Sequence, residues 1–205
     1  MQVEIKKLKE SEAEEKIDIN IKTWWTTYKG LIPDDIIAKI QVKTKERIEQ
    51  QKKTIREKNN TYGIYVDNKL VGYSSYGPAR DENYKDSCEI YSCYILEEYQ
   101  RLHLGSRVVI KILEDFINEG YKTMITKCLV GNKANKFREA IGGKYVKTIN
   151  SIILGYTFTE NIYYHDDIKK SLEINKDKQI MDDSIQTNDA KLYEKGGTKN
   201  DRKRK

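Results

Sequence analysis

Residues 97–116, "EEYQRLHLGSRVVIKILEDF", decide the fold of this 205-residue chain. A loop at residues 100–106 runs directly into an amphipathic helix, and a β-rich run, "CEIYSCYIL" at residues 88–96, precedes it. A strand that leads through a tight loop into a helix presents unpaired amides and the positive end of the helix dipole. That arrangement binds phosphate groups. A single junction of this kind is weak evidence, because most strand–helix junctions bind nothing.

The sequence on either side predicts the remaining elements. Alternation predicts a strand at residues 3–8 and a hairpin at residues 61–78, whereas helical spacing follows from residue 11 and again from Pro33. Beyond the central helix, which Gly120 closes, the pattern predicts a strand at residues 122–130, a short helix before Gly142 and Gly143, and two strands over residues 144–164. The order is strand, two helices, three strands, helix, strand, helix, two strands. It predicts a mixed α/β sheet built around a strand–loop–helix crossover.

The charge of the chain is unevenly distributed. Hydrophobic residues make up 38% of the chain and charged residues 34%, with a formal net charge of +6. Residues 169–205 hold eleven Lys or Arg and seven Asp or Glu, so most of the net charge lies there and the preceding domain is close to neutral. This segment lacks the apolar surface that would offset its ordering entropy. We therefore predict one domain at residues 1–168 and a charged, disordered tail at residues 169–205.

Several function classes are disfavoured by composition. Cys88, Cys93 and Cys128 are an odd set without C-x-x-C spacing, and only His103 and His165 could join them, so we predict no metal site. No segment reaches membrane-spanning length and the N-terminus has no apolar leader, which predicts a soluble, cytoplasmic protein with no membrane partner. The final "KNDRKRK" lacks aromatic stacking partners, so nucleic acid is not the expected partner.

The segment "EIYSCYILEEYQRLHLGSRVV" resembles the acetyl-CoA motif Q/R-x-x-G-x-G/A of the GNAT superfamily of N-acetyltransferases. Gln100 matches the first position, Gly105 matches the second glycine, and His103 stands where the first glycine is usual. Three further segments look like the family in the required order: "IKTWWTTYKGLIPDD", "VGYSSYGPARDE" and "NKANKFREAIGGKYV". The resemblance covers residues 1–168. It implies a GNAT-like mixed, mostly antiparallel sheet of about six to seven strands flanked by helices.

The resemblance also implies where acetyl-CoA binds as the cosubstrate. The backbone of Cys93 and Ile95 would bond the pantetheine arm as an added strand does, and an amide there would hold the thioester oxygen. The amides of the loop would cradle the pyrophosphate, and Asn132 beside Phe137 would contact pantetheine or cap the short helix. The cofactor-binding residues expected on this basis are Cys93, Ile95, Gln100, Arg101, Leu102, His103, Leu104, Gly105, Ser106, Asn132 and Phe137. At His103 an ordinary φ and an outward side chain would still let the amide donate.

Three residues are candidates for catalysis. Glu89 holds the position of a carboxylate that in relatives takes a proton from the amine through water, and its alternative is a strand-end ion pair or hydrogen bond. Arg138 stands where the family has the tyrosine that protonates the leaving thiolate. Arginine does not give up its proton at neutral pH, so it would act by its charge, on the thiolate or on the 3′-phosphate. Alternatively, Tyr94 would supply the proton.

The expected reaction is acetyl transfer from acetyl-CoA to a primary amine of a small molecule or peptide. Trp24, Trp25, Tyr28 and Tyr76 are candidates for the acceptor site, although one of the two tryptophans is expected in the core because adjacent helix residues cannot face the same way. The alternative is a non-catalytic acyl-CoA-binding relative, since His103 and Arg138 replace two family residues. The sequence does not identify the acceptor amine, and it leaves open whether the chain forms a homodimer.

Overall fold

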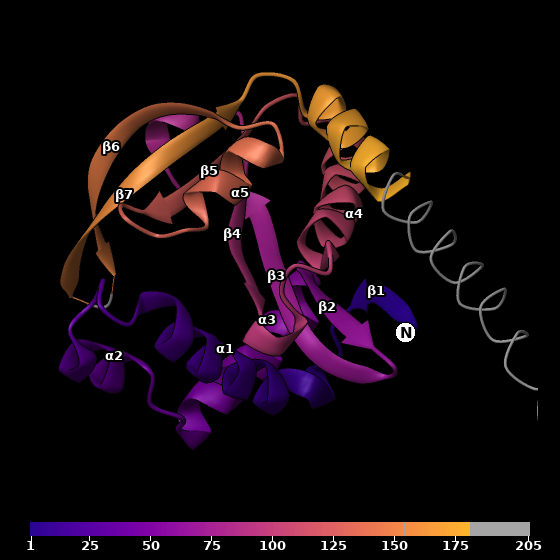
Figure 1. Cartoon of the computed structure of the whole chain (residues 1–205). Helices are drawn as coiled ribbons and strands as arrows, with labels where there is room; N and C mark the ends of the chain where they lie inside the picture. The colour runs from indigo at the N-terminus through magenta and orange to yellow at the C-terminus, as the bar shows by residue number, and fades with distance from the viewer. Residues whose placement is uncertain (154, 181–205) are drawn as a thin grey trace, which may run out of the picture.

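The computed structural model of the chain describes residues 1–153 and 155–180. One seven-stranded sheet crosses the molecule in the order β1-β2-β3-β4-β5-β7-β6, and only the β4–β5 pair is parallel (Figure 1). The strands are β1 (Val3–Lys7), β2 (Thr61–Val66), β3 (Lys69–Pro78), β4 (Cys88–Ile95), β5 (Met124–Leu129), β6 (Lys144–Ile153) and β7 (Tyr156–His165). The mixed, mostly antiparallel sheet predicted from the sequence is confirmed.

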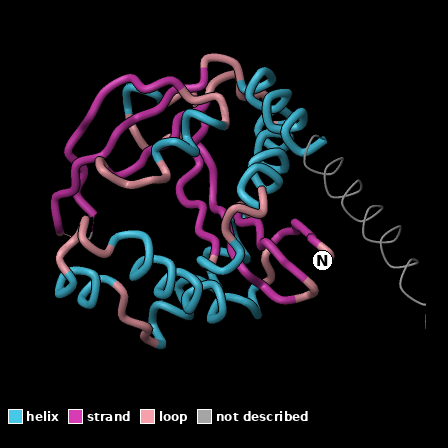
Figure 2. Tube along the Cα trace, viewed as in Figure 1, coloured by secondary structure: helices cyan, strands magenta, loops and turns pink. Residues whose placement is uncertain are grey.

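Helices cover both faces of this sheet. They are α1 (Ala13–Tyr28), α2 (Asp34–Ile40), α3 (Lys45–Lys58), α4 (Leu104–Asn118) and α5 (Asn135–Ala140), followed by a helix at residues 168–180. Short 3₁₀ turns lie at Glu10–Glu12, Glu82–Tyr84 and Glu97–Tyr99. Figure 2 shows two groups of helices, with α1, α2 and α3 together on one side and α4 beside the 168–180 helix on the other.

The core consists of apolar clusters on the two faces. The cluster under α4 joins its buried side chains, among them Val108, Ile112 and Phe116, to Ile90 of β4 and Met124 of β5. On the opposite face, Ile19 of α1 and Ile55 of α3 pack on Tyr65 and Tyr73. Burying an aliphatic side chain contributes roughly 1.5–3 kcal/mol, so the apolar stripe of α4 is enough to determine which way this helix faces.

The first half of the chain has three helices where the sequence predicts two. The polar stretch after Pro33 forms both α2 and α3, and Thr44 caps α3 by accepting a hydrogen bond from the Arg47 amide at 3.1 Å. Ile55 is the one buried residue that anchors α3. Apart from Ile48, which is half-buried, its other side chains are charged or polar, which is why periodicity alone indicates this helix only weakly.

The domain extends beyond the boundary predicted at residue 168. Residues 168–180 are helical, and Ile168, Ser171 and Asn175 are at most 2% exposed. The prediction of a disordered tail from residue 169 differs from the structure here, because buried polar side chains, which composition does not reveal, dock this helix. Asn175 Nδ2 donates to the Ser171 and Ile141 carbonyl oxygens at 2.7 and 3.3 Å. The rest of the predicted tail, residues 181–205, lies outside the described residues.

None of the helices among residues 1–153 and 155–180 combines the length and the apolar character needed to cross a membrane.

Candidate active site

The sheet opens between β4 and β5. These strands pair only over three residues, from Cys88–Met124 to Ile90–Thr126, while β4 stays paired with β3 as far as Ile95. Consecutive β3 residues Ser75 and Tyr76 pair with Ser92 and Ile90, so Tyr91 is the extra residue of a β-bulge. A bulge bends its strand, and this one directly follows the last β4–β5 pair. The edge of β4 from Tyr91 to Ile95 therefore faces no β5 partner, and Figure 1 shows β5 leading away toward β6 and β7.

The predicted phosphate loop lies at the end of this open edge and leads into α4. His103 is the N-cap of α4 and is exposed, but its φ is 56°, in the left-handed region. Arg101 also has a positive φ, 61°. The side chain of His103 thus points outward as predicted, whereas its φ is not ordinary. Left-handed backbone at two non-glycine residues disfavours the unbound loop and is typical of ligand-binding turns.

Gly105 has a packing role that the motif does not reveal. A Cβ at this position would lie 3.0 Å from the Phe137 ring. The loop thereby contacts α5 directly, and Gly105 is required because the backbone approaches an aromatic ring. Gln100, in contrast, is exposed and donates from Nε2 to the Ile95 carbonyl oxygen at 2.9 Å, which fastens the loop to the end of β4.

Two asparagines hold α5 beside the opening. Asn132 Oδ1 accepts from the Ala134 amide at 2.8 Å, an Asx turn that leads into α5, whose N-cap is Ala134 and not the asparagine. Asn135 Nδ2 donates to the Leu129 carbonyl oxygen at 2.8 Å, and its Oδ1 accepts from the Tyr163 hydroxyl at 2.8 Å. The helix is thus joined to β5 and β7 by several bonds, so the side chains it carries are held in place.

Arg138 of α5 is buried, with 7% of its surface exposed, and its Nε and Nη1 atoms have no hydrogen-bond partner. It makes no ion pair with any residue in the described part of the chain. Burial raises the pKa values of the Cys93 thiol on β4 and the Cys128 thiol on β5, and the positive charge of Arg138 opposes both shifts. The guanidinium therefore lies near both strands where they separate.

Tyr94 and Tyr28 meet on the α1 side of the opening. Their hydroxyl oxygens are 3.1 Å apart, and the Tyr28 ring lies edge-on to Trp24 at 4.8 Å between ring centres. Burial raises the pKa of both tyrosines, so both keep their protons at neutral pH. Trp24 is a core residue with an unpartnered Nε1, and Trp25 is half-buried against the same cluster. Trp24, Tyr28 and Tyr94 are therefore brought together as a group.

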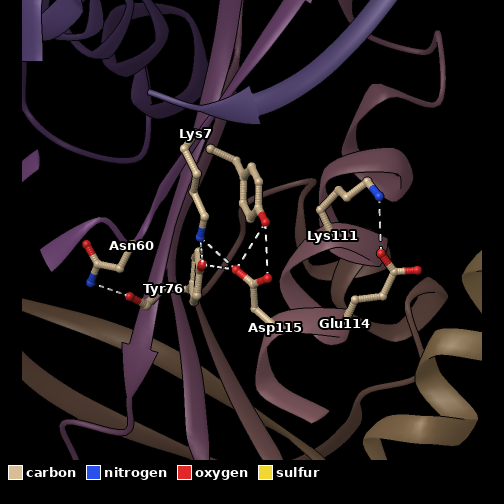
Figure 3. A network of polar contacts seen from close by, with 7 residues as sticks. Lys7, Asn60, Tyr76, Lys111, Glu114 and Asp115 are labelled. Carbon is tan, nitrogen blue, oxygen red and sulfur yellow. Dashed lines mark hydrogen bonds and ion pairs between the residues drawn. The ribbon is translucent and has the colours of Figure 1, made fainter. Parts of the chain in front are cut away.

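Tyr76, which was predicted as an acceptor-site residue, is not part of that group and lies on the α4 side of the sheet. Its ring lies edge-on to Phe116 of α4 at 5.2 Å between ring centres, and its hydroxyl donates to Asp115. Figure 3 shows this network, in which Lys7 also contacts Asp115, at 2.6 Å, and the Tyr76 hydroxyl. Tyr76 is three residues from Tyr73 on β3, so strand alternation puts the two rings on opposite faces, Tyr73 on the α1 side and Tyr76 on the α4 side.

Glu89 is 1% exposed and engaged by Arg80. Its Oε1 accepts from Arg80 Nη2 at 2.6 Å, and its Oε2 accepts from the Arg80 amide at 2.9 Å. This is the structural alternative considered for Glu89, an ion pair near the start of a strand. A carboxylate with both oxygens occupied is poorly placed to accept a proton through water.

A second carboxylate, missed by the sequence analysis, lies on β7. Glu160 is opposite Leu129 of β5 and is half-buried, and its carboxylate makes no hydrogen bond or ion pair with the described residues. Its negative charge contributes to the raised pKa values of Tyr94 and Cys128. Strand alternation could have revealed Glu160 from the sequence. Phe158, Glu160 and Ile162 share one strand face, and an acidic residue between two apolar ones on such a face is unusual.

An apolar hollow of about 510 Å³ adjoins this region. The segment between α1 and α2 forms one wall and the ends of β5 and β7 form the other. Its lining residues are Leu31, Ile32, Pro33, Ile36, Leu129, Val130, Tyr156, Thr157, Phe158 and Thr159. An apolar lining of this kind suits a ligand with an apolar body.

Comparison with known proteins agrees with this geometry. The model of the acetyltransferase (GNAT) family matches residues 21–139. An uncharacterized N-acetyltransferase, YuaI of Bacillus subtilis (strain 168), is 27% identical over 162 residues, which are 77% of this chain and 90% of that protein.

Two solved structures share the fold. The PaiA N-acetyltransferase of Thermoplasma acidophilum, in complex with coenzyme A, has a TM-score of 0.63 at 18% identity, covering 78% of this chain and 98% of that one. YncA of Salmonella typhimurium, a putative acetyltransferase with its cofactor acetyl-CoA, has a TM-score of 0.61 at 15% identity over 80% and 94% of the two chains.

Proposed function

The chain belongs to the GNAT family of acetyltransferases, and from that premise we propose that it transfers the acetyl group of acetyl-CoA to a primary amine of a small molecule or peptide. The observation that carries the proposal is the opening between β4 and β5, with a left-handed loop and a helix N-terminus at its end. This combination offers a strand edge to the pantetheine arm and amides to the pyrophosphate.

The reaction requires a neutral amine, because an ammonium group has no lone pair with which to attack. Once deprotonated, the amine nitrogen attacks the thioester carbon, and an amide on the open edge from Tyr91 to Ile95 stabilises the oxyanion. The C–S bond then breaks and the electron pair leaves with sulfur. Glu89 and Glu160 are the two carboxylates on which the first step can depend, and Glu160 is the one without a partner among the described residues.

The apolar hollow supports an acceptor whose amine is attached to an apolar or extended group. It lies on the same side of the sheet as Tyr28 and Trp25, which were expected in the acceptor site. Because the amine is a cation before it reacts, the carboxylate of Glu160, whose charge acts on Tyr94 and Cys128, would attract it.

The alternative is an acyl-CoA-binding relative without activity. Arg138 in place of the usual tyrosine and the occupied carboxylate of Glu89 are the observations in its favour. Release of free CoA thiol over a panel of amines separates the two. Acetyl-CoA binding without turnover of any amine in the panel would favour the binding protein.

Cofactor binding at the loop is tested by Ser106→Glu. Position 106 is in the first turn of α4, where a carboxylate interacts favourably with the helix dipole, so the unbound protein should be as stable as wild type. The same charge would repel the pyrophosphate, and we expect calorimetry to show acetyl-CoA affinity reduced at least about tenfold, or 1.4 kcal/mol.

Ser106→Gln is the matched control, because it has the same shape without the charge. If Ser106→Glu binds acetyl-CoA as tightly as Ser106→Gln does, the pyrophosphate does not lie on this loop. Substitution of Gly105 would be a poorer test, since any side chain there strikes Phe137 first.

A further inference from the structure

The buried guanidinium of Arg138 has no carboxylate to pair with among residues 1–153 and 155–180. It is 7% exposed, two of its three nitrogens have no partner, and no described carboxylate forms an ion pair with it. Burying a charge without a partner is strongly unfavourable, and native proteins avoid it unless a ligand supplies the missing charge. The unpartnered atoms are all donors, so the missing partner is an acceptor or an anion.

The position of this cation restricts what the anion can be. Arg138 lies near Cys93 and Cys128, one on each strand beside the opening, and its neighbour Phe137 contacts the loop at Gly105. The pyrophosphate loop is at the exposed end of the opening, where His103 points outward. In an acyl-CoA whose phosphates lie on that loop, only the narrow sulfur end can reach a group buried between the strands. The 3′-phosphate, at the nucleotide end, cannot.

We propose that Arg138 is the counter-ion of the CoA thiolate, so that the leaving group departs as an anion and needs no proton donor. This inference rests on the proposed function. When the tetrahedral intermediate collapses, the C–S bond breaks, the electron pair passes to sulfur, and the thiolate forms beside the guanidinium. The proton lost by the amine leaves through the base to solvent. Arginine suits this role because it keeps its charge throughout.

The chain also shows why a proton donor is dispensable. The hydroxyl groups of Tyr94 and Tyr28 are hydrogen-bonded to each other at 3.1 Å. Burial raises the pKa of each, so each is a weaker acid than a free tyrosine. A thiol, by contrast, is already acidic, with a pKa of about 8.5 in the side-chain analogue. Electrostatic stabilisation of the thiolate by a nearby cation is therefore favoured over its protonation by either tyrosine.

The test measures the thiol pKa of free CoA bound to the protein, from the pH dependence of thiolate ultraviolet absorbance and of CoA affinity. In wild type we expect the bound pKa to fall by at least about one unit, so that CoA binds at least tenfold more tightly as thiolate than as thiol. In Arg138→Met the pKa should rise above that of free CoA, because the thiolate is then buried without a counter-ion. Arg138→Lys should give an intermediate value.

Desulfo-CoA, which lacks the sulfur, is the control ligand in wild type, and its affinity should not change with pH over the same range. It also provides a test that needs no variant. If CoA and desulfo-CoA show the same pH dependence, or if Arg138→Met leaves the bound thiol pKa unchanged, Arg138 does not hold the thiolate. Failure of wild type to bind either ligand would instead refute the proposed function.

Discussion

The residues placed to act as base and to stabilise the leaving group at the opening are not the ones that the family motif indicates. Glu89, which the motif favours, is held by Arg80, whereas Glu160, which no motif marks, has no partner for its carboxylate within the described part of the chain. Arg138 replaces a proton donor by a fixed positive charge. In both cases the side chain's partners, and not its position in a motif, decide what it can do.

The same substitution at Glu160 and at Glu89 distinguishes the roles of the two carboxylates. We expect Glu160→Gln to lower turnover by about 10²–10⁴-fold and to move the pH optimum upward, because the amine then has to deprotonate unaided. Glu89→Gln should mainly reduce stability, by about 1–3 kcal/mol, since it weakens the bonds of a buried carboxylate to the partly exposed Arg80. Steady-state pH profiles and denaturant unfolding of both variants provide the measurements.

The opposite pair of results would support Glu89 as the base, as the sequence predicts. If Glu89→Gln shifts the pH profile and Glu160→Gln leaves it unchanged, Glu89 is the base despite its two bonds to Arg80.

Arg138 is also expected to reduce the stability of the unbound protein. Replacing a buried charge that has no partner by a side chain of similar length removes a desolvation penalty. Arg138→Met should therefore raise the free energy of unfolding, by about 1–4 kcal/mol on the scale seen when buried ions are replaced by apolar side chains. Thermal unfolding without ligand measures it. A marked loss of stability would mean that the guanidinium has a structural partner.

At the scale of elements, β7 and the 168–180 helix are joined by a buried histidine. His165 is 1% exposed, and its Nδ1 lies 3.0 Å from Ser171 Oγ. Burial, aided by the nearby charge of Arg138, lowers the pKa of His165 from 6.5 to about 4. The ring is thus neutral in the folded protein at neutral pH, and docking of the helix depends on that state.

This arrangement predicts a pH dependence of stability. Between pH 6.5 and 4 the unfolded chain binds a proton at His165 and the folded chain does not, so protonation favours unfolding. The stabilisation is complete above about pH 6.5 and is lost progressively as the pH falls toward 4, by about 3 kcal/mol in total.

Urea unfolding of wild type and His165→Gln over this pH range tests the dependence. The variant should show a flatter profile, whereas His103→Gln, which removes the exposed histidine, should behave as wild type. Parallel profiles for wild type and His165→Gln would show that carboxylates cause the loss.

At the scale of the whole molecule, the domain includes the 168–180 helix. It lies beside α4 in Figure 1, and Lys176 Nζ pairs with Glu114 of α4 at 3.0 Å. Gly142 leaves room for Ser171, since a Cβ there would lie 2.9 Å from the serine hydroxyl. These contacts are made between segments distant in the sequence, which is why composition alone placed the boundary too early.

Two truncations test this boundary. A chain ending at residue 180 should keep the stability and acetyl-CoA affinity of the full chain. One ending at residue 168 loses the cover over Ile141 and His165 and leaves Ile168 at a free end, so we expect it to be less stable by ~2 kcal/mol or more. Thermal unfolding and calorimetry of both chains are the measurements. Equal stability of the two would show that residues 169–180 contribute nothing to the domain.

The sequence by itself determined the order of the strands, the mixed sheet and the loop before α4. Alternation, helical spacing and turn residues act over a few neighbouring positions, so these features can be read locally. The family resemblance rests on the same short segments, "EEYQRLHLGSRVV" among them.

Only the tertiary structure decided which side chains meet at the opening. The bulge at Tyr91 lies where the β4–β5 pairing ends, Arg80 engages Glu89, and Glu160 of β7 comes close to Tyr94 and Cys128. Register, burial and ion pairing are set by contacts between distant segments, and a one-residue shift exchanges the two faces of a strand. For that physical reason the fold could be predicted from local pattern, and the partners of Arg138, Glu89 and Glu160 could not.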